Sequence, residues 1–184
     1  MKNLRRSATA VACTVLAGSA LLAAASVAAA GSETRSGQRI LSWSDMVKLT
    51  QRTEDQLEAA KAATEKYRDI NKAVADGFVA GSPDVPGEGI HYVNPGRLDC
   101  TFEAARPEIL LYALLPGHTQ HQLVALEYAI PYACMPQTGP PPGGFAGSLD
   151  VWHNDEPPPF WTLDAWLFLK NPDGVFAQGN PRIP

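Results

Sequence analysis

Three residues of this sequence have the types needed for acid–base or metal chemistry: His91, Glu127 and Asp164. Each lies in a stretch otherwise made of apolar residues, and a polar group in such a setting needs a partner. If all three side chains point to one face, His91 would serve as a nitrogen ligand or general base. The two carboxylates would serve as metal ligands or as acid–base partners. The metal in that interpretation would be a divalent ion.

A structural role for the same residues is the alternative. A histidine among apolar neighbours is more often satisfied by a backbone carbonyl or a carboxylate than by a metal, and Glu127 could instead pair with Arg68, Arg97 or Arg106. No H-E-x-x-H signature is present to decide between the two. They differ in geometry, because a site requires side chains that converge in a pocket.

Other catalytic signatures are missing from the sequence. It contains no G-x-S-x-G elbow, no G-x-x-x-x-G-K-[ST] loop and no strand-borne G-x-G-x-x-G, so a serine nucleophile and a nucleotide cofactor are not expected. His118 and His121 flank an expected hairpin turn, and His153 precedes the polar run Asn-Asp-Glu. We therefore expect these three histidines at the surface.

Aromatic residues offer a second kind of site. Trp152 and Trp161 flank a polar, proline-rich loop and form the expected surface pair, a platform for a sugar, peptide or protein ligand. From the sequence alone, the favoured function is a non-catalytic binding or interaction domain that uses this surface. The alternative is a metal-dependent or acid–base enzyme centred on His91, Glu127 and Asp164.

The elements that must position these residues begin with a helical segment from Ser44 to Phe78. This segment is rich in Ala, Glu, Lys, Leu and Gln and contains no proline. Apolar residues recur in it at intervals of three or four, which is typical of one buried helix face. They are Leu57, Ala60, Ala63, Tyr67, Ile70, Val74 and Phe78.

After Pro83 the pattern changes to short strands separated by Gly- and Pro-rich breaks. Residues 115–119 predict a turn that joins the second and third strands in a hairpin. A helical segment followed by such a series of strands predicts an α+β fold with the helix packed on an antiparallel sheet. The expected strands span residues 89–93, 109–115, 122–130, 148–151 and 162–169.

The beginning of the chain predicts export. Lys2, Arg5 and Arg6 precede a long run of apolar and small residues that closes on Ala28-Ala29-Ala30, as in a signal peptide cleaved after residue 30. Residues 31–41 are then expected to form a flexible tether, and residues 42–184 a single domain. The expected location is secreted, or extracellular.

Export makes a disulfide the first interpretation of the two cysteines outside the leader, Cys100 and Cys134. A bridge between them would stabilise the fold by roughly 3–4 kcal/mol. A metal site built on these two thiolates lacks the C-x-x-C spacing that usually supports one.

Charge limits the partners. The whole sequence has a formal net charge of −4, and the predicted leader removes basic residues only, so the exported chain is more acidic still. An acidic chain without a basic stripe is not expected to bind nucleic acid. No apolar run after residue 30 approaches the roughly 20 residues that span a bilayer, so no transmembrane segment is expected there.

Five separated blocks resemble a family of small secreted bacterial proteins of unknown function. The resemblance spans Tyr67 to Pro181 and implies the compartment and the domain boundary rather than a mechanism. In that family the position of Asp164 is most often histidine, so this chain departs from the pattern there. The blocks are residues 67–78, 89–95, 106–112, 123–128 and 163–181.

Overall fold

The structure is a computed structural model that describes residues 43–147, 149–154 and 159–184. These residues belong to a compact unit that spans Leu41–Pro184. The predicted signal peptide, residues 1–30, and the predicted tether, residues 31–41, lie outside the described residues.

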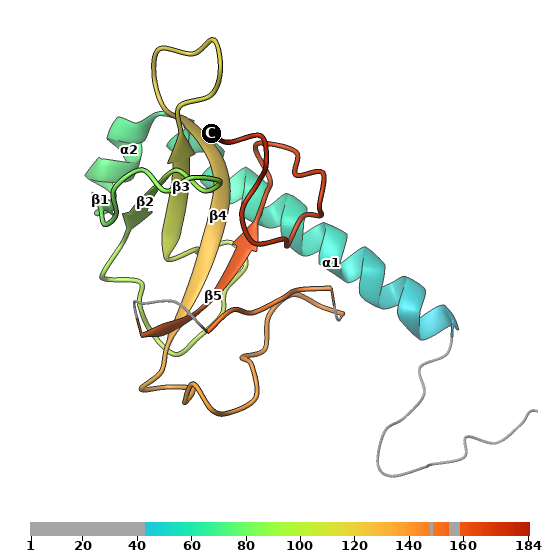
Figure 1. The fold of residues 1–184 in the computed structure, drawn as a ribbon. Helices are drawn as coiled ribbons and strands as arrows, with labels where there is room; N and C mark the ends of the chain where they lie inside the picture. Colours follow the sequence, from blue (N-terminus) through green and yellow to red (C-terminus); the bar gives the residue numbers. More distant parts are fainter. Residues whose placement is uncertain (1–42, 148, 155–158) are drawn as a thin grey trace, which may run out of the picture. The chain divides into compact units, whose positions relative to one another are not determined.

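Three helical pieces occupy the segment that the sequence predicts to be helical (Figure 1). They are α1 (Trp43–Thr64), the 3-10 helix η1 (Glu65–Arg68) and α2 (Ile70–Ala75). The break falls at Asp69, whose extended backbone starts α2 and whose side chain accepts a hydrogen bond from the backbone N–H of Asn71. Aspartate is a favoured N-cap because its carboxylate satisfies an N–H that has no helical partner.

Five strands form one antiparallel sheet in the order β1-β2-β3-β4-β5, so every strand pairs with its neighbours in sequence. The fold is therefore α+β, with helix packed on an antiparallel sheet, as the sequence predicts. The strands are β1 (Val79–Ala80), β2 (Ile90–Val93), β3 (Ile109–Ala113), β4 (Gln122–Pro131) and β5 (Phe160–Ala165).

Two of the expected strands need correction. The strand expected at residues 148–151 is wrong, since residues 149–151 are irregular and residue 148 lies outside the described part. The strand expected at 162–169 begins earlier and ends at Ala165, because the backbone N–H of Trp166 turns to the carbonyl of Val175 and leaves the sheet. The two-residue strand β1 was not expected.

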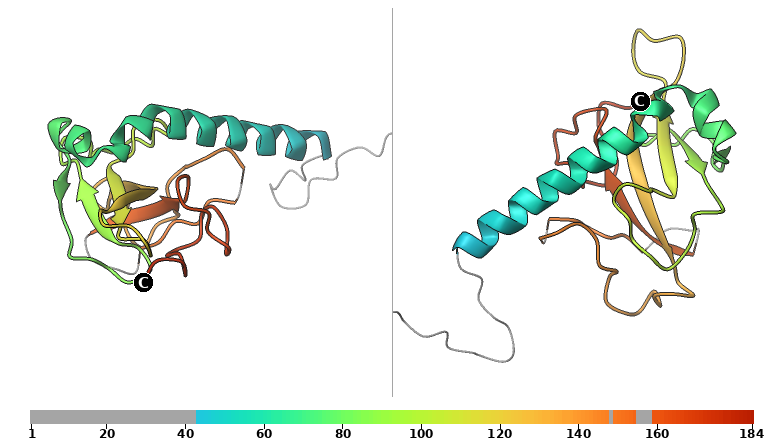
Figure 2. Two further views of the ribbon diagram at one scale, coloured as in Figure 1. Left: turned by 90° about the horizontal axis from the view of Figure 1, so that it is seen from above. Right: turned by 180° about the vertical axis from the view of Figure 1, so that it is seen from behind.

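Apolar side chains pack on both faces of the sheet. The end of α1, η1 and α2 cover one face of the sheet (Figure 2). The residues buried in this part of the core include Tyr67, Phe78 and Tyr112. On the opposite face Leu111, Trp166 and Ile183 pack together, so the C-terminal segment contributes to that cover. All five residues of β3 are buried as a consequence.

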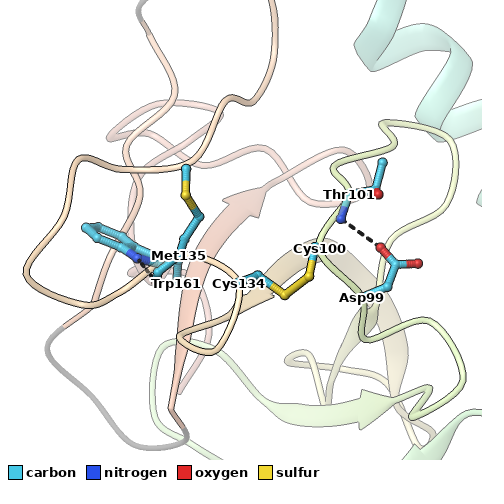
Figure 3. The surroundings of a disulfide bond; sticks show 6 residues. All are labelled: Asp99, Cys100, Thr101, Cys134, Met135 and Trp161. Atoms are coloured by element: carbon cyan, nitrogen blue, oxygen red, sulfur yellow. Dashed lines mark hydrogen bonds between the residues drawn. A yellow bond between two sulfur atoms is a disulfide. The ribbon is translucent and has the colours of Figure 1, made fainter.

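Cys100 and Cys134 form a disulfide, with their Cα atoms 5.3 Å apart, which confirms the predicted pairing (Figure 3). The bond joins the connection between β2 and β3 to the turn that follows β4. In the same turn, the carbonyl of Met135 accepts a hydrogen bond from the indole of Trp161. The disulfide therefore fastens one end of the central strands.

Within the described ranges, none of the helices has the length and apolar character needed to cross a bilayer.

Candidate functional site

The sheet places His91, Glu127 and Asp164 on one face. Glu127 of β4 lies directly opposite Asp164 of β5, and on its other side it lies opposite Ile109 of β3. Ile109 in turn lies opposite Val93, which is two residues from His91. Because side chains alternate along a strand, residues two apart share a face. The three residues predicted from the sequence are therefore brought to the same side of the sheet.

His91 lies between two carboxyl groups. Its Nε2 atom is 3.4 Å from Oε2 of Glu127 and 3.3 Å from Oε2 of Glu88. The Oε2 atom of Glu127 is buried and makes no hydrogen bond to the described residues. Both contacts are slightly long for a hydrogen bond. Proton transfer between these groups would require a bound ligand to shorten them.

The hydroxyl of Ser82 contacts both the backbone and the ring of His91. The Ser82 hydroxyl donates to the carbonyl of Pro83 at 2.7 Å and accepts from the backbone N–H of His91 at 3.0 Å. Its oxygen also lies 3.0 Å from Nδ1 of His91. With the one hydroxyl hydrogen directed to Pro83, Nδ1 is the donor in this last contact. Nε2 is then the nitrogen that can accept or release a proton beside Glu127.

A tight turn carries Glu88 to this position. The backbone N–H and carbonyl of Val85 both bond to Gly89, and the carbonyl of Gly87 accepts from the N–H of Asn180 in the C-terminal segment. Gly89 has φ +90°, a backbone conformation that favours glycine. A Cβ at this position would collide with the carbonyl oxygen of Tyr112 on β3. Glycine is therefore required where the turn joins the sheet.

Burial and like charge act together on the Glu127–Asp164 pair. Each residue is only 7% exposed. Burial raises the pKa of Glu127 well above its usual value, and the facing Asp164 carboxyl raises it further. Burial likewise raises the pKa of Asp164, and Glu88 adds to the rise, while a hydrogen bond from the Gly179 N–H opposes it. Two such carboxyls retain protons that exposed ones would lose.

These groups open onto a pocket of about 460 Å³, here called the acidic pocket. Its polar lining comes from Ser82, Glu88, His91, Glu127, His153, Asn154, Thr162 and Gln178. Its apolar lining comes from Val85, Val93, Ile109 and Phe160, with Gly81 at the edge. Asp164 does not line the pocket, so it acts on the pocket through Glu127. A cavity of this size suits a small molecule.

His153 is a pocket residue that the sequence analysis missed. The expectation of an exposed His153 is wrong, because its backbone pairs with Thr162 and so extends the sheet beyond β5. Its Nε2 atom is buried and has no hydrogen-bond partner among the described residues. No local sequence pattern predicts that His153 lines the pocket, because its place there depends on a loop that returns to the edge of the sheet.

The arginines proposed as partners of Glu127 lie elsewhere. Arg68 pairs with Glu65, Arg97 bonds to the carbonyl of Pro107 and to the hydroxyl of Tyr67, and Arg106 pairs with Asp99. Of the two interpretations drawn from the sequence, this placement supports convergence in a pocket.

The predicted metal ion is a separate matter. Across residues 43–147, 149–154 and 159–184, no group of three or more His, Cys, Asp and Glu side chains is arranged to hold a metal ion. A divalent ion at His91, Glu127 and Asp164 stays a prediction.

The two tryptophans of the predicted ligand surface do not form an exposed pair. Trp161 is only 5% exposed and its indole N–H is bonded to Met135, so its expected exposure is wrong. The alternation of β5 turns this ring inward (Figure 3). Trp152 is half-buried, with its ring centre 6.1 Å from that of Phe102.

Glu108 is a further buried carboxyl that the sequence analysis did not select. It is 1% exposed, and its Oε2 accepts a hydrogen bond from the backbone N–H of Ala129 at 3.1 Å. Burial raises its pKa to about 7. Because Glu108 satisfies the backbone of β4 just beyond the paired end of β3, we assign it a structural role.

Comparison with known proteins adds no relative. The chain matches no protein-family model, no curated protein and no solved structure. The resemblance to a family of small secreted proteins therefore stays a prediction from the sequence.

Proposed function

We propose that this protein is an acid–base enzyme that acts on a small molecule held in the acidic pocket. The observation that supports the proposal best is the buried Oε2 atom of Glu127, which has no hydrogen-bond partner among the described residues and faces Nε2 of His91 at 3.4 Å. A buried carboxyl without a partner costs stability, and such costs are concentrated at functional sites.

The proposed mechanism follows the protons of Glu127 and His91. In the proposed starting form the Glu127 carboxyl carries a proton and Nε2 of His91 is the acceptor. Glu127 donates its proton to a basic atom of the ligand while Nε2 of His91 accepts a proton from an acidic one. The imidazolium then returns a proton to the Glu127 carboxylate, which restores both groups. Asp164 is a positioning residue that keeps Glu127 protonated before the reaction.

The binding domain favoured from the sequence stays a prediction, and the burial of Trp161 removes one of the two tryptophans named for its surface. Ligand binding moves in this proposal to the acidic pocket, where it precedes proton transfer.

The test is a search for turnover without a preselected substrate. Purified protein is incubated with a complex extract of small molecules, and mass spectrometry follows which solutes are consumed and formed. We expect at least one solute to change with the wild type, and to stay unchanged with Glu127→Gln or His91→Gln. The matched control, Glu58→Gln, alters an exposed residue of α1 and should retain turnover.

A parallel incubation with a metal chelator separates the two chemistries. Turnover that persists with chelator and requires Glu127 and His91 supports the acid–base mechanism. Turnover abolished by chelator would overturn it in favour of the metal. Absence of turnover with folded wild type would overturn the enzyme proposal.

A further inference from the structure

The charge of the acidic pocket is one-sided. Glu88 and Glu127 line it, and Asp164 lies directly opposite Glu127 across the strand pair. Among the described residues that line the pocket there is no lysine or arginine. An anionic ligand such as a phosphate or carboxylate would find only acidic groups there, whereas an ammonium group would favour the ionised form of Glu127 and pair with it.

Three of the described cationic side chains are engaged on other groups. Arg97 donates to the Pro107 carbonyl, Arg106 pairs with Asp99, and Lys66 pairs with Asp76. The described contacts of these three side chains thus place their charge away from Glu127.

An independent observation points to a ligand at the same place. Glu127 is more than nine-tenths buried and lines the pocket, yet its carboxyl group accepts no hydrogen bond from the described residues. A protonated amine carries three N–H donors and no acceptor. It could donate to Glu127 and Glu88 together, and its third N–H could reach the side chain of Asn154, Thr162 or Gln178, which also line the pocket.

The apolar part of the pocket indicates what else the ligand should contain. Val85, Val93, Ile109 and Phe160 form its apolar lining. This lining would cover a short hydrocarbon or ring, and burying that group would contribute to binding. A ring face such as that of Phe160 also attracts cations.

We infer that the acidic pocket binds a small organic amine, whose ammonium group is held by Glu127 and Glu88 and whose apolar part lies against Val93, Ile109 and Phe160. The inference rests on the pocket of the proposed function and assigns its substrate class.

The test compares three probes of matched size: benzylamine, benzyl alcohol and benzoate. Binding of each to the full chain is measured by NMR titration, with the signals of Val93 and Ile109 as reporters of the pocket. We expect benzylamine to bind at least tenfold more tightly than benzyl alcohol, and benzoate to leave both signals unchanged. Equal or tighter binding of the alcohol or benzoate would overturn the inference.

Variants assign the contact to individual carboxyls. Glu127→Gln and Glu88→Gln should each weaken benzylamine at least tenfold and leave benzyl alcohol nearly unchanged, while Glu58→Gln should bind like the wild type. Two separate variants keep the test valid if one fails to fold. Benzylamine binding that neither substitution weakens would also contradict the inference.

The outcome is distinct from that of the proposed function. Turnover of a neutral or anionic solute that depends on Glu127 and His91 would overturn the amine and leave the enzyme standing. Selective amine binding without turnover of any solute would support the amine and overturn the enzyme.

Discussion

Glu127 and Asp164 lie directly opposite each other on neighbouring antiparallel strands, β4 and β5. Like charges at such a pair repel, since the side chains of facing residues start only about 5 Å apart. Both residues are buried, so water does little to screen the repulsion. Burial and the facing carboxyl raise the pKa of Glu127, which favours its protonated form beside His91.

We expect Asp164→Asn to lower the pKa of Glu127. The amide retains an acceptor for the Gly179 N–H and removes the charge that raises the Glu127 pKa. Carboxyl ¹³C NMR over a pH series measures the effect directly. The exposed Asp173→Asn serves as control and should leave the Glu127 titration unchanged. An unaltered Glu127 pKa in Asp164→Asn would show that the two carboxyls do not interact.

We expect Ser82→Ala to change the tautomer populations of His91. Without the hydroxyl, Nδ1 loses the acceptor that holds its hydrogen, and the usual mixture of neutral tautomers returns. Imidazole ¹⁵N chemical shifts distinguish the forms. We expect Nδ1–H in the wild type, a mixture in Ser82→Ala and the wild-type spectrum in Ser82→Thr. A wild-type spectrum from Ser82→Ala would contradict the assigned role.

Glu108 should make stability depend on pH. Its carboxyl loses its proton near 4.5 in the unfolded chain but only near 7 in the folded protein. The folded state therefore holds more protons in this interval, and the free energy of unfolding falls as pH rises from 4.5 through 7, by up to about 3 kcal/mol.

Glu108→Gln should remove this part of the decline, since the amide oxygen still accepts from Ala129. Urea unfolding of both proteins should give similar stability at low pH and a more stable variant above neutral pH. The reverse order above neutral pH would mean that the folded protein stabilises the Glu108 carboxylate, and that its pKa is lowered rather than raised.

Replacing both Cys100 and Cys134 with serine should lower the free energy of unfolding by about 3–4 kcal/mol, because the unfolded chain regains the freedom lost in a loop that joins residues 34 apart. Denaturant unfolding measures the loss. Adding reductant should destabilise the wild type by a similar amount and leave the double variant unaffected. A reductant effect on the double variant would indicate another cause.

The sequence predicted the elements that carry strong periodicity. Strands β2, β3 and β4 lie within two residues of their expected bounds, because each is a run of apolar residues closed by turn formers. The helical segment was recognised as a whole, but its division at Asp69 was not. The expected strand at 148–151 shows the limit, since Leu149 and Val151 are apolar yet exposed in an irregular segment.

The candidate site was predicted in part for the same reason. His91, Glu127 and Asp164 stand out as polar residues inside apolar runs, and the regular alternation of strands brings them together. Ser82, Glu88 and His153 lie in turns and loops, whose positions depend on hydrogen bonds between distant segments. No local sequence pattern encodes those bonds. The contribution of Ser82, Glu88 and His153 to the site was therefore seen only in the structure.

Gly89 links the packing of the sheet to the geometry of the acidic pocket. The residue precedes β2, and its neighbours Glu88 and His91 both reach the pocket. Any side chain at position 89 would press against β3 and displace both neighbours at once. A single substitution at Gly89 would therefore alter the packing of the turn on β3 and the geometry of the acidic pocket together.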